Sequence, residues 1–108
     1  MSQDTIFLQD YTKCLFGRFR TENEKSAEAF RDDVLLPSLL IHDLVTLDIS
    51  MKYGLPASSL EEIFGGLVRH SNMTTEEILN RLNIVSDCEV NKNSALTYIR
   101  DAAKNDRT

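Results

Sequence analysis

Strand and helix patterns alternate along this chain, and this order limits the folds it can adopt. The clearest strand covers 44–50, where Val45, Leu47 and Ile49 form the apolar side of an alternating pattern. A helix pattern follows, with one apolar stripe made of Leu60, Ile63, Phe64, Leu67 and Val68. A helix between successive strands implies parallel pairing through right-handed crossovers. The sequence therefore predicts an α/β fold, a small open sheet, mixed or mostly parallel, of about four strands packed by about four helices.

Weaker patterns fill the first part of the chain. Residues 5–9 indicate a first strand, and residues 13–19 indicate a weaker second strand that Gly17 interrupts. Ser26 is a good N-cap for a helix over 27–36. Pro37 lies within this periodic stretch, so we expect the helix to end, kink or restart there.

Further helix starts follow the strand at 44–50. Two overlapping capping boxes, Ser58 with Glu61 and Ser59 with Glu62, predict the start of the second helix in either register. Another capping box begins a helix at Thr74, a short strand is expected over 83–86, and a final helix is expected from Asn93. We predict one domain over residues 5–103 and a polar tail over 104–108.

Composition excludes several classes of function. The chain has 17 acidic and 12 basic residues and a net charge of −5, so it lacks the positive charge that nucleic acids and anionic membranes attract. It has no long apolar run and no signal-peptide pattern at its start. Cys14 and Cys88 show no disulfide or metal spacing, so we expect buried, inert thiols in the cytoplasm. No catalytic motif is present, and we expect no enzyme activity, cofactor or metal.

Two groups of residues are candidate binding sites. Ser58 and Ser59 lie at a helix start near the carboxyl ends of the strands, where they either cap the helix or accept a phosphate. Arg18 and Arg20 belong to a local excess of positive charge that either binds an anion or forms part of a mixed charged surface.

The glycine pair Gly65-Gly66 lies in the middle of the predicted second helix. Each glycine there costs about 1 kcal/mol relative to alanine, so the pair needs a structural reason. Close internal packing and a partner-binding face both remain open.

Four segments, taken together, resemble a known family. They are Gly17-Arg18-Phe19-Arg20, Ser26-Ala27-Glu28-Ala29-Phe30-Arg31, Leu36-Pro37-Ser38-Leu39 and the run from Ser58 to Arg69. In this order they resemble the STAS-like domains of undefined function found in bacteria and mobile elements, which are distant relatives of anti-sigma factor antagonists. The resemblance covers about residues 5–103, and its most specific part is the run from Ser58 to Arg69.

The resemblance implies a non-enzymatic regulatory module that docks on a partner protein, an ATPase or kinase of the GHKL type. In the antagonists, phosphorylation of a serine at this helix start blocks docking, and the matching position here is Ser59, with Ser58 beside it. The antagonist pattern has an aspartate and a glycine where this chain has Ala57 and Leu60. The expected docking residues around the helix start are Tyr53, Leu55, Leu60, Glu61 and Glu62.

Two other functions remain open at this point. One is a constitutive oligomeric or inhibitory binding protein of a phage or mobile element, and a homodimer is among its forms. The other is a nucleotide-binding or small-anion-binding domain that uses Arg18 and Arg20.

Overall fold

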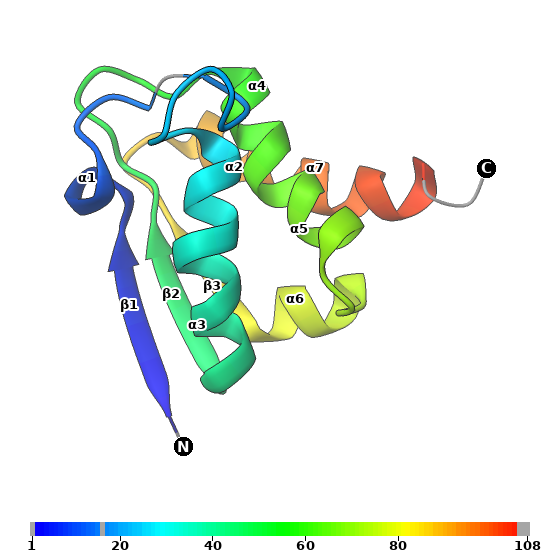
Figure 1. The fold of residues 1–108 in the computed structure, drawn as a ribbon. Coiled ribbons are helices and arrows are strands. Elements are labelled where there is room, and N and C mark those ends of the chain that lie inside the picture. Colours follow the sequence, from blue (N-terminus) through cyan, green and yellow to red (C-terminus); the bar gives the residue numbers. More distant parts are fainter. Residues whose placement is uncertain (1, 16, 106–108) are drawn as a thin grey trace.

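The computed structural model describes residues 2–15 and 17–105, and in this part the chain forms one three-stranded sheet (Figure 1). The strands are β1 (Gln3–Phe7), β2 (Leu44–Asp48) and β3 (Leu82–Val85). They lie in the order β1-β2-β3 and both pairs are parallel, so the predicted α/β class is confirmed. In the register, Thr5 lies opposite Thr46, and Thr46 lies opposite Asn83.

The helices lie mainly in the two crossovers between strands. α1 (Leu8–Tyr11) directly follows β1. α2 (Ala27–Phe30), the π-helical turn η1 (Arg31–Leu35) and α3 (Leu36–Ile41) form one continuous helix, called here the 27–41 helix. α4 (Ala57–Leu60), the π-helical turn η2 (Glu61–Gly65) and α5 (Gly66–His70) form the 57–70 helix. α6 (Thr75–Arg81) runs into β3, and α7 (Glu89–Asn105) ends the described chain.

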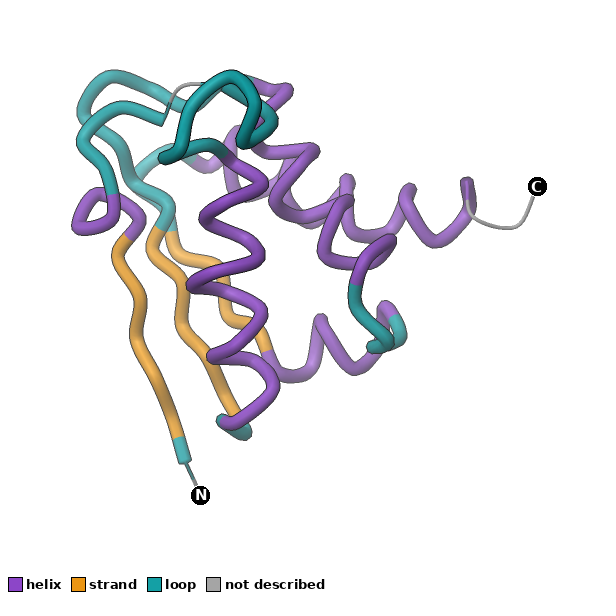
Figure 2. Tube along the Cα trace, viewed as in Figure 1, coloured by secondary structure: helices purple, strands orange, loops and turns teal. Residues whose placement is uncertain are grey.

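The topology places both crossovers on the same face of the sheet. A strand order of 1-2-3 with right-handed crossovers sends every connection over the same side. Figures 1 and 2 show the helices other than α1 on one side of the three strands, and α1 at the end of β1. On the other side, Gln3, Thr5 and Phe7 of β1 are exposed, as are Asn83 and Val85 of β3. Among the three strands of residues 2–15 and 17–105 the strand order does not reverse, so this part of the chain lacks the crevice in which larger open α/β sheets bind ligands.

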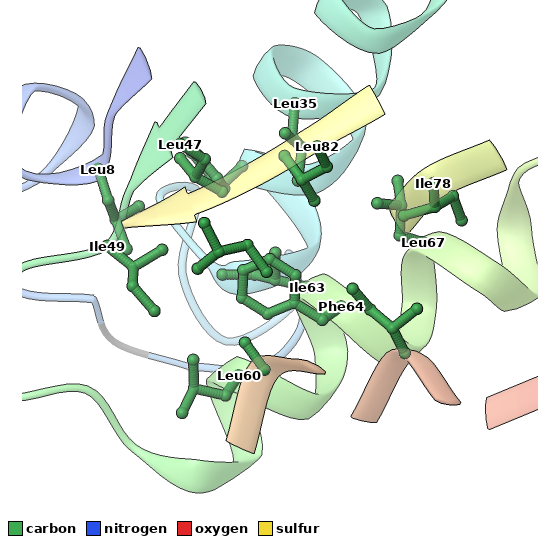
Figure 3. Close-up of a cluster of buried hydrophobic side chains, with 14 of the residues drawn as sticks. Leu8, Leu35, Leu47, Ile49, Leu60, Ile63, Phe64, Leu67, Ile78 and Leu82 are labelled. Carbon is green, nitrogen blue, oxygen red and sulfur yellow. The ribbon is translucent and has the colours of Figure 1, made fainter. Parts of the chain in front are cut away.

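The core lies between the sheet and the 57–70 helix (Figure 3). Val45 and Leu47 of β2, and Ile49 directly after it, are fully buried, as the alternation predicts. The apolar stripe of the second helix is also confirmed, because Leu60, Ile63, Phe64 and Leu67 are buried in this core and Val68 is partly buried against it.

The expected second strand over 13–19 is wrong for the described residues, and Phe16 lies outside them. Gly17 has a φ of 76°, which turns the chain. The carbonyl oxygens of Gly17 and Arg18 accept hydrogen bonds from the N–H groups of Ala27 and Glu28 at 3.2 and 3.0 Å. These N–H groups have no partner within their own helix, so the loop satisfies them and three strands result rather than four.

Other boundaries differ by a few residues. The first strand begins at Gln3 rather than Thr5. α7 includes Lys104 and Asn105, which were expected in the tail, and 106–108 lie outside the described residues. The helix that Ser26 caps continues through Pro37, which lies in the first turn of α3 directly after η1. Proline has no N–H group to donate, and in the first turn of α3 after the π-helical turn the loss of this donor does little harm to the helix.

Candidate functional site

Charged side chains from three separate segments meet where the loop at 17–20 crosses the two long helices. We call this group the ion cluster, and its members are Arg18, Arg31, Asp32, Glu61, Glu62 and Arg69. Four of them lie in the π-helical turns, Arg31 and Asp32 in η1 and Glu61 and Glu62 in η2, while Arg18 lies in the loop and Arg69 in α5.

The buried centre of the ion cluster is the pair formed by Arg31 and Glu62. Arg31 is 2% exposed, and the side chain of Glu62 is 5% exposed. Nη1 of Arg31 donates to Oε2 of Glu62 at 2.5 Å and to the Glu62 carbonyl oxygen at 3.0 Å. Nε of Arg31 donates to Oδ1 of Asp32 at 2.9 Å. The pair therefore joins the two helices by charge-assisted hydrogen bonds out of contact with water.

The outer half of the ion cluster is partly exposed. Arg18 donates from Nε to Oε1 of Glu62 at 2.8 Å and from Nη2 to Oε1 of Glu61. Arg69 binds the same Glu61 carboxylate through two N–H groups, at 2.6 and 3.1 Å. Arg18 thus ties its loop to the 57–70 helix, and Arg69 is bonded within that helix.

The charged environment controls the protonation of Glu62. Burial on its own would raise the pKa of this carboxyl group, but hydrogen bonds from Arg18 and Arg31 outweigh burial and lower it. Glu62 is therefore a carboxylate at neutral pH. A carboxylate that accepts from two arginines is a poor proton acceptor for a substrate, so the ion cluster is suited to holding the fold rather than to acid–base catalysis.

The glycine pair is explained by the same side chains. A Cβ atom added to Gly66 would collide with Nη1 of Arg31, and one added to Gly65 would collide with the Glu61 carboxylate. Of the two interpretations left open by the sequence, internal packing agrees with these contacts. The neighbours that require glycine are charged side chains of the ion cluster.

The arginines expected to bind an anion already have carboxylate partners. Arg18 binds both glutamates, and Arg20 forms a two-pronged pair with Asp33 at 3.0 and 2.7 Å. The interaction with Arg20 lowers the pKa of Asp33 and raises that of Arg20, through the hydrogen bond between them. The mixed charged surface is therefore the interpretation that the described contacts favour, and an anion would have to displace these carboxylates.

The two serines differ in their exposure. Ser58 is exposed, but Ser59 is 1% exposed, so of the two candidate phosphate acceptors only Ser58 offers an accessible hydroxyl group. The helix begins one residue before the pair, with Pro56 at the N-cap, and neither serine caps it through its side chain. Glu61 and Glu62 bind arginines in place of the capping bonds.

The expected docking residues are also divided. Leu60 and Glu62 are buried, and Glu61 is bound to arginines, so these three do not form a free docking face. Leu55 is partly buried against the core. Tyr53 is 68% exposed and remains accessible.

Tyr53 lines a shallow hollow of about 270 Å³ beyond the ends of β1 and β2. The other lining residues are Gln9, Asp10, Lys13 and Lys52, and the ammonium group of Lys52 lies 5.5 Å from the centre of the Tyr53 ring. We call this feature the Tyr53 hollow. Gly54 follows with a φ of 83°, which turns the loop back toward the 57–70 helix.

Sequence reasoning missed a polar contact between β1 and the 27–41 helix. Oγ of Ser38 donates to Oδ2 of Asp4 at 2.5 Å, and Nδ1 of His42 lies 3.0 Å from the Ser38 carbonyl oxygen. Oγ of Ser38 lies farther, at 3.3 Å, from Nδ1 of His42, so the shorter bond to the Asp4 carboxylate favours a structural contact over a serine activated by histidine. The i, i+4 spacing of Ser38 and His42 at the end of the 27–41 helix could have suggested their contact, but Asp4 joins them only through the fold.

The remaining expectations concern cysteines, metals and membranes. Cys14 is exposed and Cys88 is partly exposed, so the prediction of buried thiols is wrong. Within residues 2–15 and 17–105, no group of three potential ligands is placed to hold a metal ion. No helix in this part of the chain has both the length and the apolar character needed to cross a bilayer. Comparison with protein-family models, curated proteins and solved structures finds no match.

Proposed function

We propose that the protein is a non-enzymatic regulatory module that docks on a partner protein through the Tyr53 hollow. The observation that carries this proposal is the exposed Tyr53 ring beside Lys52 on a surface loop. Tyrosine is enriched among the residues that dominate binding energy at interfaces, because its large ring loses little conformational entropy. The ion cluster holds the neighbouring 57–70 helix in place and leaves this loop to make the contact.

The partner class comes from the resemblance to STAS-like domains and anti-sigma factor antagonists. It indicates a GHKL-type ATPase or kinase as the partner, and a cytoplasmic location in a bacterium, a phage or another mobile element. In this proposal Ser58 is the phosphate acceptor, because it is the exposed hydroxyl of the pair. A phosphate there would add nearly two negative charges at the start of the 57–70 helix, close in sequence to Tyr53.

The test compares two exposed side chains of similar prominence. Tyr53→Ala removes the proposed contact, and Val90→Ala removes a 72% exposed side chain from α7 as a matched control. Binding is measured by calorimetry against a purified GHKL-type ATPase, the partner class of this proposal. We expect Tyr53→Ala to weaken binding by at least about tenfold, as for an interface hot spot, and Val90→Ala to leave it unchanged.

A second readout covers the case in which the partner is of another class. A photo-crosslinking amino acid at position 53 should capture one protein from the host, while the same amino acid at exposed Glu76 should not. If Tyr53→Ala binds the captured and purified partner as tightly as the unchanged protein does, the docking surface lies elsewhere.

A second candidate function has one observation in its favour. Lys13 and Lys52 line the Tyr53 hollow together with an aromatic ring, a combination that suits a nucleotide or another small anion. Thermal-shift measurements with a panel of nucleotides test this alternative. A midpoint that does not move with any nucleotide excludes it.

A further inference from the structure

The outer edge of β1 is an unpaired edge of the sheet within the described chain. β1 pairs only with β2, and Figure 1 shows it at the border of the sheet with α1 at its end. Edge strands in natural proteins are commonly protected by short length, lysine, proline, bulges, inward-pointing charges or a covering loop, and of these β1 has a length of five residues and the inward Asp4. The sequence of β1, Gln-Asp-Thr-Ile-Phe, contains neither lysine nor proline. Its one charged side chain, Asp4, is held by Ser38 on the helical side of the sheet.

The pairing of β1 with β2 determines which backbone groups face outward. The Ser2 carbonyl oxygen accepts from the Leu44 N–H group at 3.2 Å, so the backbone of Ser2 points toward β2. Because N–H and C=O groups alternate in direction along a strand, Gln3, Thr5 and Phe7 point theirs outward. The C=O group of Phe7, the N-cap of α1, accepts the first bond of that helix. Its N–H group and both groups of Gln3 and Thr5 face outward.

We infer that β1 pairs with β1 of a second copy of this chain, antiparallel and centred on Thr5. A two-fold axis at Thr5 lets the two Thr5 residues exchange both of their hydrogen bonds. It also brings the Phe7 N–H group of each copy to the Gln3 carbonyl oxygen of the other. The result is one continuous six-stranded sheet.

Charge and hydrogen bonding select a second copy in this register. With the axis at Thr5, each Asp4 lies opposite Ile6 of the other copy, and no like charges face each other. A shift of the axis to Asp4 would place two carboxylates directly opposite, which is destabilising. A shift of the axis to Ile6 would require the Phe7 carbonyl oxygen to accept a hydrogen bond from the other copy, but this oxygen already accepts the first hydrogen bond of α1. The strand is therefore complementary to itself in one register.

This inference goes beyond the proposed docking function and uses a different surface. One pair of strands buries less than the roughly 1,200 Å² that stable complexes need, so we expect weak association that depends on protein concentration. Sedimentation velocity from about 5 to about 500 µM should show the mass of the full chain rising from monomer toward dimer.

Two substitutions separate the edge from the open face. Thr5→Lys places two lysines opposite each other at the two-fold axis, and we expect a monomer over the whole concentration range. Thr46→Lys makes the same change at the residue that lies opposite Thr5 on the central strand, away from the edge. We expect this control to associate like the unchanged protein.

A mixing experiment tests the register. Thr5→Glu alone should also be monomeric, but an equimolar mixture of Thr5→Glu and Thr5→Lys should form dimers, because position 5 then faces an opposite charge. Restored association also demonstrates that both variants are folded. The inference is overturned if the unchanged protein stays monomeric, if Thr46→Lys dissociates the dimer as Thr5→Lys does, or if the mixture does not associate.

Discussion

Replacing Glu62 by glutamine should destabilise the protein more than any comparable change of a surface carboxylate. The substitution keeps the size of the side chain but removes the negative charge that balances Arg31. Arg31 is 2% exposed and cannot turn to water without opening the junction between the two long helices. The nearby carboxylate of Asp32 remains, bonded to Nε of Arg31 at 2.9 Å.

The expected cost follows from the bonds that Glu62 accepts. Arg18 and Arg31 donate to it at 2.8 and 2.5 Å, and each bond loses about 1 to 1.5 kcal/mol when its acceptor becomes neutral. Removing one partner of a buried ion pair typically costs about 3–5 kcal/mol. Because Asp32 still compensates part of the charge of Arg31, we expect about 3 kcal/mol, which lowers the melting temperature by roughly 15 °C for a domain of this size.

Urea unfolding followed by circular dichroism at pH 7 measures this change against two controls. Glu61→Gln changes a carboxylate whose arginine partners are 36% and 31% exposed, so it should cost only about 0.5–1 kcal/mol. Glu76→Gln changes an exposed residue on α6 and should stay within about 0.5 kcal/mol of the unchanged protein. In an Arg31→Met background, Glu62→Gln should cost much less, because the buried charge has gone.

The reasoning is refuted if Glu62→Gln unfolds at the same urea concentration as the unchanged protein. It is also refuted if Glu61→Gln proves more destabilising than Glu62→Gln. Either result would mean that the buried pair contributes no more than an exposed one.

Three further predictions concern Gly66, the two serines and the pH dependence of stability. Gly66→Ala should lower the free energy of unfolding by about 1–3 kcal/mol, although alanine has the better helix propensity. In an Arg31→Met background the same change should raise the free energy of unfolding by about 1 kcal/mol, and an effect of equal sign in both backgrounds would contradict the proposed collision. Ser59→Asp should lower the melting temperature by more than about 10 °C, because the hydroxyl group is buried, while Ser58→Asp should change it little. Equal melting temperatures of the two variants would contradict the burial of Ser59. Because the pKa of Glu62 is lower in the folded protein, its carboxylate stabilises the fold fully above about pH 4.3, the ordinary pKa of glutamate. This stabilisation is lost as the pH falls through the pKa of Glu62 in the folded protein. Glu62→Gln lacks the carboxylate, so its free energy of unfolding should fall less than that of the unchanged protein in an acid titration.

The sequence was sufficient for features that depend on local periodicity. The alternation around Leu47 predicted the buried central strand, and the capping box at Thr74 is present with both of its hydrogen bonds. Ser26 caps its helix as expected. In each case the residues that determine the structure are neighbours in the chain, so a short window contains the relevant interactions.

The predictions that failed depend on partners distant in sequence. The two capping boxes at Ser58 and Ser59 have the correct spacing, but Glu61 and Glu62 form ion pairs with arginines from other segments. The apolar stretch over 13–19 resembles a strand, yet its backbone satisfies the start of the 27–41 helix. Propensity and spacing contain no information on such long-range competition, and tertiary contacts decided the outcome.

The ion cluster also changes what the proposed resemblance to STAS-like domains can support. Its arginines come from three of the segments on which that resemblance rests, namely Arg18, Arg31 and Arg69, and its glutamates lie beside the glycines that make room for them. These residues depend on each other physically, since each charge is buried or paired only because the others are present. The presence of all these residues in one sequence therefore supports one structural feature, the ion cluster that joins the loop at 17–20 to the 27–41 helix and the 57–70 helix. It does not by itself support a shared phosphorylation switch, which depends on an exposed serine and on the loop that carries Tyr53.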